Sequence, residues 1–311
     1  MENKKTVLIT GAHGFLGKHV MSRFQRDPNF DVIAPTSVEL NLLDIDDIDY
    51  YLEEYRPNII IHLAAMCGGI GANMKSPATF LYNNLMMTTN LIDMACNTEN
   101  LEKFVGIGTV CSYPKYTPVP FKEEDLYNGY PEETNAPYGL AKRMQLEMLR
   151  ACRAEYGTNG IMLIPVNMYG EWDNFDDSSS HVIPAMLKKF HYAKISGDSS
   201  VSLWGDGSAS REFLYAGDCA DAIKLAVLNY NDPEPINIGT GKEITIKDLA
   251  ELVADIVGFE GKIEWDTSMP NGQPRRCLDV SRAKNLLGFE AKAELAPTLK
   301  RVYDWAKENQ L

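Results

Sequence analysis

A glycine-rich segment near the start of the chain restricts the fold more than any other feature of the sequence. Residues 6–9 form a short apolar and β-branched run, and Gly11, Gly14 and Gly17 follow it at the start of a stretch with helical spacing. Between a strand and a helix, the first glycine permits a tight turn, the second lets the backbone approach a pyrophosphate, and the third allows close packing. The segment therefore predicts a dinucleotide-binding unit, and a plain tight turn is the weaker interpretation.

The rest of the first half alternates short apolar runs with amphipathic segments. The runs of strand length lie at residues 31–34, 58–63, 104–108 and 161–166. Helical spacing covers residues 78–96 and 139–156. Strands that alternate with helices predict a parallel sheet covered on both faces, which is a Rossmann-type doubly wound α/β fold.

The pattern changes after residue 170. An acidic, serine-rich loop at 171–180 is followed by short helices and strands up to a helix at 295–309. This change predicts a smaller C-terminal α/β domain. We expect a cofactor-binding domain at 1–170 and a mainly substrate-binding domain at 171–311, with segments around 210–240 able to cross between them.

Length, composition and charge exclude several classes of protein. The chain has 311 residues, of which 45% are hydrophobic and 23% charged, as in a soluble globular enzyme of about two domains. The net charge of −13 argues against a nucleic-acid partner, because phosphate binding needs a positive field. The start lacks a signal-type apolar segment, and no 18-residue apolar stretch occurs, so we expect a cytoplasmic protein with no membrane partner.

Six cysteines are scattered along the chain without a CxxC pair. They are Cys67, Cys96, Cys111, Cys152, Cys219 and Cys277. In a long chain without an export signal this distribution predicts free thiols, and neither a disulfide framework nor a metal site is expected.

A YxxxK pair supplies the first catalytic candidates. Tyr138 and Lys142 are spaced so that both side chains lie on one helix face, one turn apart. A neighbouring ammonium favours the ionised form of a phenol, so Lys142 is expected to lower the pKa of Tyr138 while also holding the cofactor ribose. In reductases with this motif a Ser or Thr at the end of the preceding strand completes the set, and here that residue is Thr109.

Two further residues indicate proton transfer at carbon. Val110 and Cys111 stand where sugar dehydratases commonly carry a carboxylate pair, so dehydration is disfavoured. A thiol that faces the substrate can exchange a proton at a carbon acidified by a ketone. His181 is the second candidate, because reprotonation from the opposite face needs another group that titrates near neutral pH. Taken alone, a cysteine is more often a small buried hydrophobe and a histidine more often structural.

Several longer strings carry a closer resemblance. They are residues 68–70 (GGI), 111–115 (CSYPK), 135–138 (NAPY), 173–175 (DNF), 180–184 (SHVIP), 203–205 (LWG) and 211–214 (REFL). Together with the GxxGxxG spacing, they resemble the GDP-L-fucose synthase family of extended short-chain dehydrogenase/reductases over nearly the whole chain. The combination of Cys111 with SHVIP is far more specific than the glycine turn or YxxxK.

The resemblance implies a two-part mechanism at one site. Cys111 and His181 would exchange protons at C3 and C5 of GDP-4-keto-6-deoxy-D-mannose, while Tyr138 and Thr109 stabilise the enolate oxygen. NADPH would then deliver hydride to C4, with Tyr138 donating the proton and Lys142 keeping the pKa of the phenol suitable.

The resemblance also places three residues at the GDP-sugar: Lys189, Trp204 and Arg211. Cations suit the diphosphate, and an indole offers a flat apolar wall. The alternatives are a solvated helix face for Lys189 and a core aromatic for Trp204.

The expected cofactor is NADP(H). The second strand ends without an acid to bind the ribose 2′-hydroxyl, and Thr36, Ser37, His13 and Lys18 could receive a 2′-phosphate, although they could equally be surface polar residues. The resemblance places the cofactor against a wider set of residues, namely Gly11, His13, Gly14, Phe15, Leu16, Gly17, Ser37, Asp44, Ala64, Tyr138, Lys142, Pro165, Asn167, Met168 and His181.

Two departures from the family pattern leave the exact sugar open: Thr109 replaces the usual Ser, and Val110 replaces a second hydroxyl. The alternatives are an enzyme for a 3,6-dideoxy or heptose GDP-4-keto sugar that epimerises one centre or none, and a nucleotide-sugar 4-epimerase that regenerates tightly held NAD. A cofactor-binding regulator is disfavoured by the intact Tyr138 and Lys142. The resemblance further implies a homodimer formed through the helices at 78–96 and 139–156, whose apolar faces could equally pack within one subunit.

Overall fold

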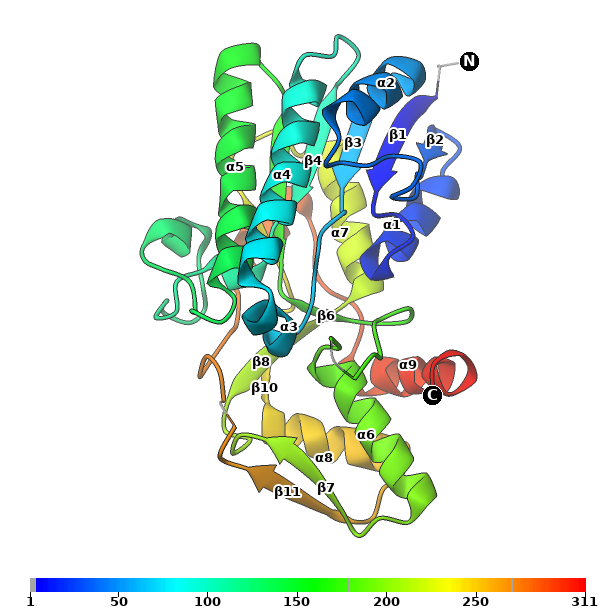
Figure 1. The fold of residues 1–311 in the computed structure, drawn as a ribbon, viewed down its shortest axis with the longest axis vertical. Coiled ribbons are helices and arrows are strands. Elements are labelled where there is room, and N and C mark those ends of the chain that lie inside the picture. The colour runs from blue at the N-terminus through cyan, green and yellow to red at the C-terminus, as the bar shows by residue number, and fades with distance from the viewer. Residues whose placement is uncertain (1–3, 178, 270) are drawn as a thin grey trace.

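The computed structural model describes residues 4–177, 179–269 and 271–311 (Figure 1). Its central feature is a six-stranded sheet in the order β2-β1-β3-β4-β5-β9, in which all paired strands run parallel. The strands are β1 (Lys5–Thr10), β2 (Phe30–Ile33), β3 (Ile59–His62), β4 (Lys103–Ile107), β5 (Gly160–Pro165) and β9 (Ile236–Ile238). The predicted Rossmann-type α/β fold is confirmed.

The strand order reverses between β1 and β3. The chain moves outward from β1 to β2 and then returns to the other side of β1. In open α/β sheets, ligands bind at such a switch point, in the crevice at the carboxyl ends of the strands. Thr10 and His62, the last residues of β1 and β3, are register partners, and Gly11 follows Thr10 directly. The glycine-rich turn therefore lies at the switch point.

Helices cover both faces of the sheet (Figure 1). α1 packs against α7 on one side, while α4 packs against both α2 and α5 on the other. Their bounds are α1 (Phe15–Gln25), α2 (Ile45–Tyr55), α3 (Ile70–Lys75), α4 (Pro77–Cys96), α5 (Ala136–Tyr156) and α7 (Ala216–Asn229). Within the described ranges, no helix has the length and apolar character needed to cross a membrane.

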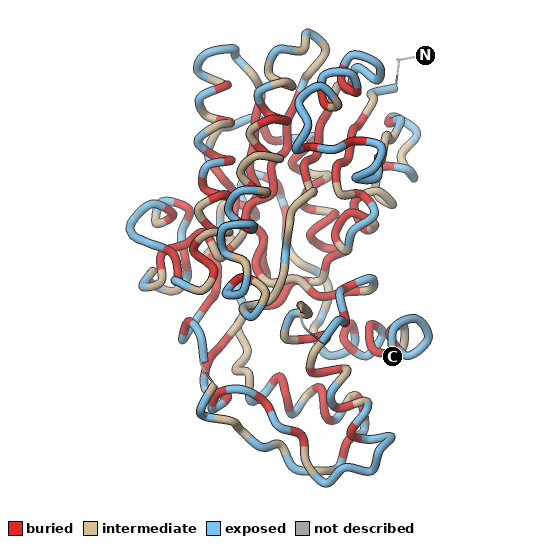
Figure 2. Tube along the Cα trace, viewed as in Figure 1, coloured by how far each residue is buried: buried red, intermediate tan, exposed pale blue. Residues whose placement is uncertain are grey.

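The central strands are apolar along their whole length because helices cover both of their faces. Every residue of β3, β4 and β5 is buried, as the red core of the upper part shows (Figure 2). This burial explains the nearly continuous apolar runs in the sequence, which lack the alternation of a sheet with one face in water.

A second, smaller core lies in the C-terminal part. It contains a three-stranded sheet in the order β10-β8-β6 and a parallel pair of β11 with β7. The strands are β6 (Asn167–Tyr169), β7 (Ser200–Trp204), β8 (Ser210–Tyr215), β10 (Glu243–Thr245) and β11 (Lys262–Asp266). The helices are α6 (Val182–Ser196), α8 (Ile246–Val257) and α9 (Leu295–Asn309), with short helical turns at Val110–Ser112, Glu123–Tyr127 and Ala283–Leu287 elsewhere.

The chain crosses between the two parts more than once. α7 and β9 follow the C-terminal strand β8 in sequence, yet they belong to the layers of the large sheet. A later segment, residues 271–279, is also shared: it bonds to β8 through Glu212 N–H to Arg276 O (3.1 Å) and to the first part through Phe121 N–H to Cys277 O (2.8 Å). The division at residue 170 stays a prediction. α7 and β9 lie within the expected crossing range of about 210–240, whereas the shared segment 271–279 lies outside it.

A substitution tests the close packing at the turn. A Cβ on Gly17 would lie 2.1 Å from the carbonyl oxygen of Gly11 and 2.6 Å from the backbone of Ala12, so Gly17→Ala is expected to lower the free energy of unfolding by about 1–3 kcal/mol or more. Gly71→Ala in α3 is the control, because a Cβ there meets nothing within 4 Å and alanine favours helix. Urea unfolding of both variants measures the difference; equal stability would contradict the packing argument.

Candidate active site

The glycine turn joins β1 to α1 through close contacts between backbone segments. Gly11 has φ +70°, and a Cβ there would lie 2.7 Å from the backbone nitrogen of Ala64. Gly14 caps α1 in an extended conformation, and its N–H donates to Gly11 O at 3.1 Å. The first turn of α1, beginning with Phe15 and Leu16, contains no acidic residue, so its N–H groups and dipole face the crevice unopposed. The residues present therefore fit the pyrophosphate of a dinucleotide.

The far edge of this crevice carries the residues expected near the adenosine ribose. The imidazole Nε2 of His13 lies 2.9 Å from Ala34 O. Ser37, three residues after Ala34, is exposed. Thr36 donates through its N–H (2.8 Å) and its hydroxyl (2.9 Å) to the carboxylate of Glu39. Asp44 accepts from Asp46 N–H as the N-cap of α2, so its side chain has a structural task. The assignment of Ser37 and Asp44 to the cofactor stays a prediction.

A buried histidine joins β1, β3 and α4 at the switch point. His62 Nδ1 lies 2.8 Å from the hydroxyl of Thr10, and Nε2 lies 3.1 Å from the hydroxyl of Thr88. Burial, and next the positive charge of Lys142, lower the pKa of His62 to about 3. The ring is therefore neutral at pH 7 and links the three elements by hydrogen bonds.

The YxxxK pair lies on the first turns of α5, as the spacing predicts. Lys142 is only 3% exposed, and burial lowers the pKa of its ammonium to about 8. Burial also raises the pKa of Tyr138 well above its ordinary value, and the neighbouring Cys67 and Cys111 act in the same direction. Desolvation is the largest of these influences and Lys142 is not among them, so the expected lowering of this pKa by Lys142 stays a prediction. Tyr138 is thus held protonated, the state that can donate a proton to a ketone oxygen.

Thr109 and Cys111 stand at the end of β4, opposite the start of α5. The hydroxyl of Thr109 accepts from Cys111 N–H at 3.2 Å and caps the short helical turn Val110–Ser112. This turn packs against α5. The sulfur of Cys111 accepts from Arg276 Nη1 at 3.5 Å. The structure therefore brings Cys111 into the neighbourhood of Tyr138, as the sequence predicts.

His181 is the N-cap of α6, at the edge of the C-terminal part. A glycine loop after β3 holds the segment that precedes it: Gly69 N–H donates to Ser179 O at 3.1 Å, and a Cβ on Gly69 would lie 2.9 Å from Ser180 O. His181 remains accessible to solvent, yet the surrounding protein partly desolvates its ring and lowers its pKa. A neutral imidazole can accept a proton.

The three residues expected at the sugar nucleotide lie on α6, β7 and β8. Lys189 is exposed and its Nζ donates to Ser202 O at 3.2 Å. Trp204 is 55% exposed, which excludes a role as a core aromatic. Arg211 bonds Ser210 O at 2.7 Å, and burial, followed by the charge of Arg276, lowers its pKa to about 10.

The remaining cofactor candidates lie where β5 continues into β6. Pro165 ends β5, while Asn167 and Met168 belong to β6. The amide of Asn167 donates to Glu212 O at 3.1 Å and so joins β6 to β8. Their contact with a cofactor stays a prediction.

Sequence reasoning missed two residues of this site. Cys67, in the loop just before Gly68 and Gly69, has its sulfur 3.5 Å from the hydroxyl of Tyr138, although it looked like one of five ordinary thiols. Arg276 contacts Cys111 from the other end of the chain. The position of Cys67 after the apolar run at residues 58–63 could have indicated that it lies near the site. No local sequence pattern indicates that Arg276 belongs to the site. All six cysteines are free thiols, as predicted.

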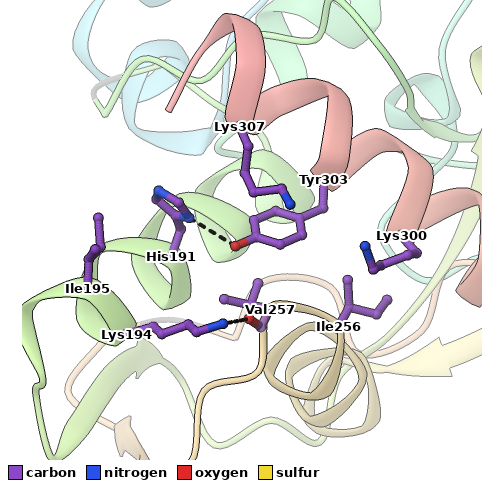
Figure 3. A pocket seen from close by; sticks show the side chains of 8 residues that line it. All are labelled: His191, Lys194, Ile195, Ile256, Val257, Lys300, Tyr303 and Lys307. Atoms are coloured by element: carbon purple, nitrogen blue, oxygen red, sulfur yellow. Dashed lines mark hydrogen bonds between the residues drawn. The ribbon is translucent and has the colours of Figure 1, made fainter.

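A cavity elsewhere in the molecule contains none of the predicted site residues. It has a volume of about 510 Å³, lies between α6, α8 and α9, and is lined by His191, Lys194, Ile195, Ile256, Val257, Lys300, Tyr303 and Lys307 (Figure 3). Its lysines already have partners: Lys194 bonds Val257 O at 2.7 Å, while Lys300 and Lys307 both pair with Asp304. The cavity is therefore separate from the reaction centre.

Comparison with known proteins decides between the families that such a site allows. Residues 7–239 match the model of the NAD dependent epimerase/dehydratase family. The chain is 38% identical over 303 residues to GDP-L-fucose synthase 1 of Arabidopsis thaliana, which covers 97% of this chain and 93% of the relative. The chain belongs to the GDP-L-fucose synthase family. The resemblance seen in the sequence is thus confirmed.

Solved structures related to this family share the whole fold. A GDP-6-OMe-4-keto-L-xylo-heptose reductase from Campylobacter jejuni superimposes with a TM-score of 0.93 at 30% identity, covering 100% of this chain and 99% of that one. MlghC, a GDP-mannoheptose C4 reductase from Campylobacter jejuni with NADP bound, gives a TM-score of 0.89 at 32% identity, with 99% of both chains covered.

The pKa of His62 generates a prediction about stability. Its folded value of about 3 lies below an ordinary value of 6.5, so between these pH values the unfolded chain binds more protons. Stability should then fall as pH drops below 6.5, by about 1 kcal/mol per pH unit from this group. His62→Gln removes that dependence. Between pH 6.5 and 5, the free energy of unfolding measured with urea should therefore change less steeply with pH in the variant than in the wild type.

Thr88→Val is the matched control for His62. It removes one hydrogen-bond partner but keeps the ring, so the wild-type slope should persist even where overall stability falls. Identical slopes for His62→Gln and the wild type would show that the ring does not titrate on unfolding.

Proposed function

We propose that this chain is a GDP-L-fucose synthase, which epimerises GDP-4-keto-6-deoxy-D-mannose at C3 and C5 and then reduces the C4 ketone with NADPH. The observation that carries the proposal is the proximity of a thiol, Cys111, and a protonated phenol, Tyr138, after β4 and at the start of α5 in a dinucleotide fold. An epimerase needs the first group and a ketone reductase needs the second. Membership of the GDP-L-fucose synthase family supports the same activity.

The cofactor is NADP(H), which supplies the hydride for C4 when bound. Gly11 and Gly17 allow β1, α1 and the chain after β3 to pack closely, and the first turn of α1 provides N–H groups for its pyrophosphate. Lys142 holds the ribose and presents positive charge beside Tyr138. The related structure with NADP bound supports this choice. The contacts of His13, Ser37, Asp44, Ala64, Pro165, Asn167, Met168 and His181 with the cofactor are part of the proposal.

Epimerisation requires proton transfer on both faces of the sugar. Cys111 and His181 take a proton from, and return one to, the carbons on either side of the C4 ketone. The C–H electron pair moves onto the C4 oxygen, where the hydroxyls of Tyr138 and Thr109 stabilise the enolate. His181 suits this task because its lowered pKa leaves the ring neutral. After hydride transfer, Tyr138 donates its proton to the same oxygen.

The substrate's nucleotide lies against the C-terminal part. Arg211 and Lys189 supply cations for the diphosphate, and the exposed indole of Trp204 supplies a flat apolar wall. These residues come from β8, α6 and β7, and the proposal places the sugar between them and the residues at the end of β4 and the start of α5.

A second candidate function is reduction of a GDP-heptose at C4 without epimerisation. The TM-score of 0.93 with a heptose reductase favours it. Deuterium incorporation distinguishes the two functions. A heptose reductase would consume NADPH but would not exchange hydrogen for deuterium at the carbons beside the ketone.

Incubation of the purified enzyme with GDP-4-keto-6-deoxymannose in D₂O tests the main proposal. The wild type should incorporate deuterium at C3 and C5, and NADPH should then be oxidised. Cys111→Ser and His181→Gln should each reduce incorporation by about 10²–10⁴-fold, because each removes one acid–base group. NADPH affinity should stay unchanged in Cys111→Ser, because Cys111 is not among the proposed cofactor contacts. Tyr138→Phe should abolish reduction, while the exposed Tyr116→Phe is the control. Absence of NADPH oxidation by the wild type would sink the proposal.

We further propose that the enzyme acts in the cytoplasm as a homodimer formed through α4 and α5. These helices pack side by side and carry exposed apolar side chains, among them Tyr82 and Met144. Burying such side chains against a second copy would remove apolar area from water.

Light scattering after gel filtration tests the dimer. Tyr82→Lys combined with Met144→Glu should yield a monomer, because each places a charge on the proposed contact face. Tyr50→Lys, an exposed position on α2, is the control and should leave the mass unchanged. A wild-type monomer, or a double variant that still dimerises, would contradict the proposal.

A further inference from the structure

Two guanidinium groups stand beside Cys111, one of them buried (Arg276) and the other half-buried (Arg211). Arg276 is 7% exposed and its Nη1 donates to the sulfur at 3.5 Å. Arg211 lies close enough to both residues that the charge of Arg276 lowers its pKa and the charge of Cys111 raises it. The two arginines come from adjacent backbone segments, which are joined by the hydrogen bond from Glu212 N–H to Arg276 O.

Neutral groups hold both guanidiniums in place. Arg276 donates through Nε (3.2 Å) and Nη2 (3.1 Å) to Gln273 Oε1, and the Gln273 amide in turn donates to Lys115 O at 2.8 Å. Arg211 donates to the carbonyl oxygens of Ser210 (2.7 Å) and Asn271 (3.3 Å). These bonds fix the direction of each side chain without neutralising its charge.

Neither arginine forms an ion pair with a carboxylate in the described part of the chain. One carboxylate, that of Glu132, raises the pKa of Arg211 through its charge without forming an ion pair with it. An oxygen of this carboxylate accepts hydrogen bonds from Thr134 and Asn135. A buried charge without a counter-charge is costly, and a second charge of the same sign increases the cost. The arrangement is therefore stabilised when negative charge develops at the position of the sulfur or beside it.

We propose that Arg276 is a positioning residue for the epimerisation step: it directs the sulfur of Cys111 and balances the negative charge that the sulfur carries as a thiolate. When the thiolate takes a proton from the carbon beside the ketone, a C–H bond breaks, an S–H bond forms, and the electron pair moves to the C4 oxygen. In the reverse direction the thiol returns the proton and the charge comes back to sulfur beside Arg276. This inference rests on the proposed function and adds to it a residue that does not itself take the proton.

The labelling rate of Cys111 with iodoacetamide at pH 7.5 tests the proposal without any substrate. Because the thiolate is the reactive form, Arg276→Gln should slow labelling of Cys111 by about tenfold or more, the fold-change expected on losing a hydrogen bond to a charged group. Peptide mass spectrometry resolves each cysteine, so Cys67, exposed at the edge of the same site, is the internal reference and should label at an unchanged rate. Arg276→Lys should recover most of the loss.

Deuterium exchange into GDP-4-keto-6-deoxymannose in the absence of NADPH gives the second readout. Arg276→Gln should lower the kcat of exchange by a similar factor while KM stays within about twofold. Arg275→Gln is the matched control, because the neighbouring arginine is exposed and pairs with Glu243 instead. If Arg276→Gln loses its fold by circular dichroism, Arg276→Met takes its place, because it keeps an unbranched side chain without the charge.

Three results would overturn the inference: unchanged labelling of Cys111, an equal effect of Arg275→Gln, or a loss confined to KM, which would assign Arg276 to substrate binding. A wild type that exchanges no deuterium would defeat the proposed function instead, and the labelling rates would still decide the role of Arg276.

Discussion

Direct contact between backbone segments at the glycine turn fixes the geometry on which the rest of the site depends. Gly17 lies against the carbonyl of Gly11, and Gly11 lies against the backbone of Ala64, so β1, α1 and the chain after β3 meet without side chains between them. This approach aims the N-terminus of α1 at the crevice. It also places the end of β3, with His62, next to the charge of Lys142 on α5.

Local patterns were sufficient to predict the fold and to locate the two short motifs, the glycine turn and YxxxK. Strands, helices and the two short motifs depend on residues a few positions apart, so spacing and hydrophobic period report them directly. Contacts between distant residues leave no such trace: Cys67 and Tyr138 are 71 positions apart, and Cys111 and Arg276 are 165 apart. The direction of the pKa shift of Tyr138 could not be predicted from the sequence either, because it is set mainly by burial, which is a property of the folded chain.

The charge around the reaction centre is opposite in sign to the net charge of the whole chain. The chain carries a net charge of −13, yet Lys142, Arg211 and Arg276 are buried or nearly so around the reaction centre, and none has an ion pair among the described residues. Desolvated cations without counter-charges create a positive potential that exposed acids, screened by water, do not cancel. Under the proposed function Arg211 contacts the diphosphate of the substrate, so substrate affinity and the stability of this part of the site depend on the same interaction.

The repeated crossing of the chain between its two cores has a consequence for how such enzymes can be recombined. A cut at residue 170 would separate β5 from its partner β9 and α1 from its partner α7, because both partners lie later in the sequence. The residues 271–279 would also leave, and with them the strand contact to Phe121. If substrate preference is to be exchanged between relatives, single elements such as α6, β7 and β8 have to be replaced one by one, because a cut at residue 170 does not release a self-contained unit from the described part of the chain.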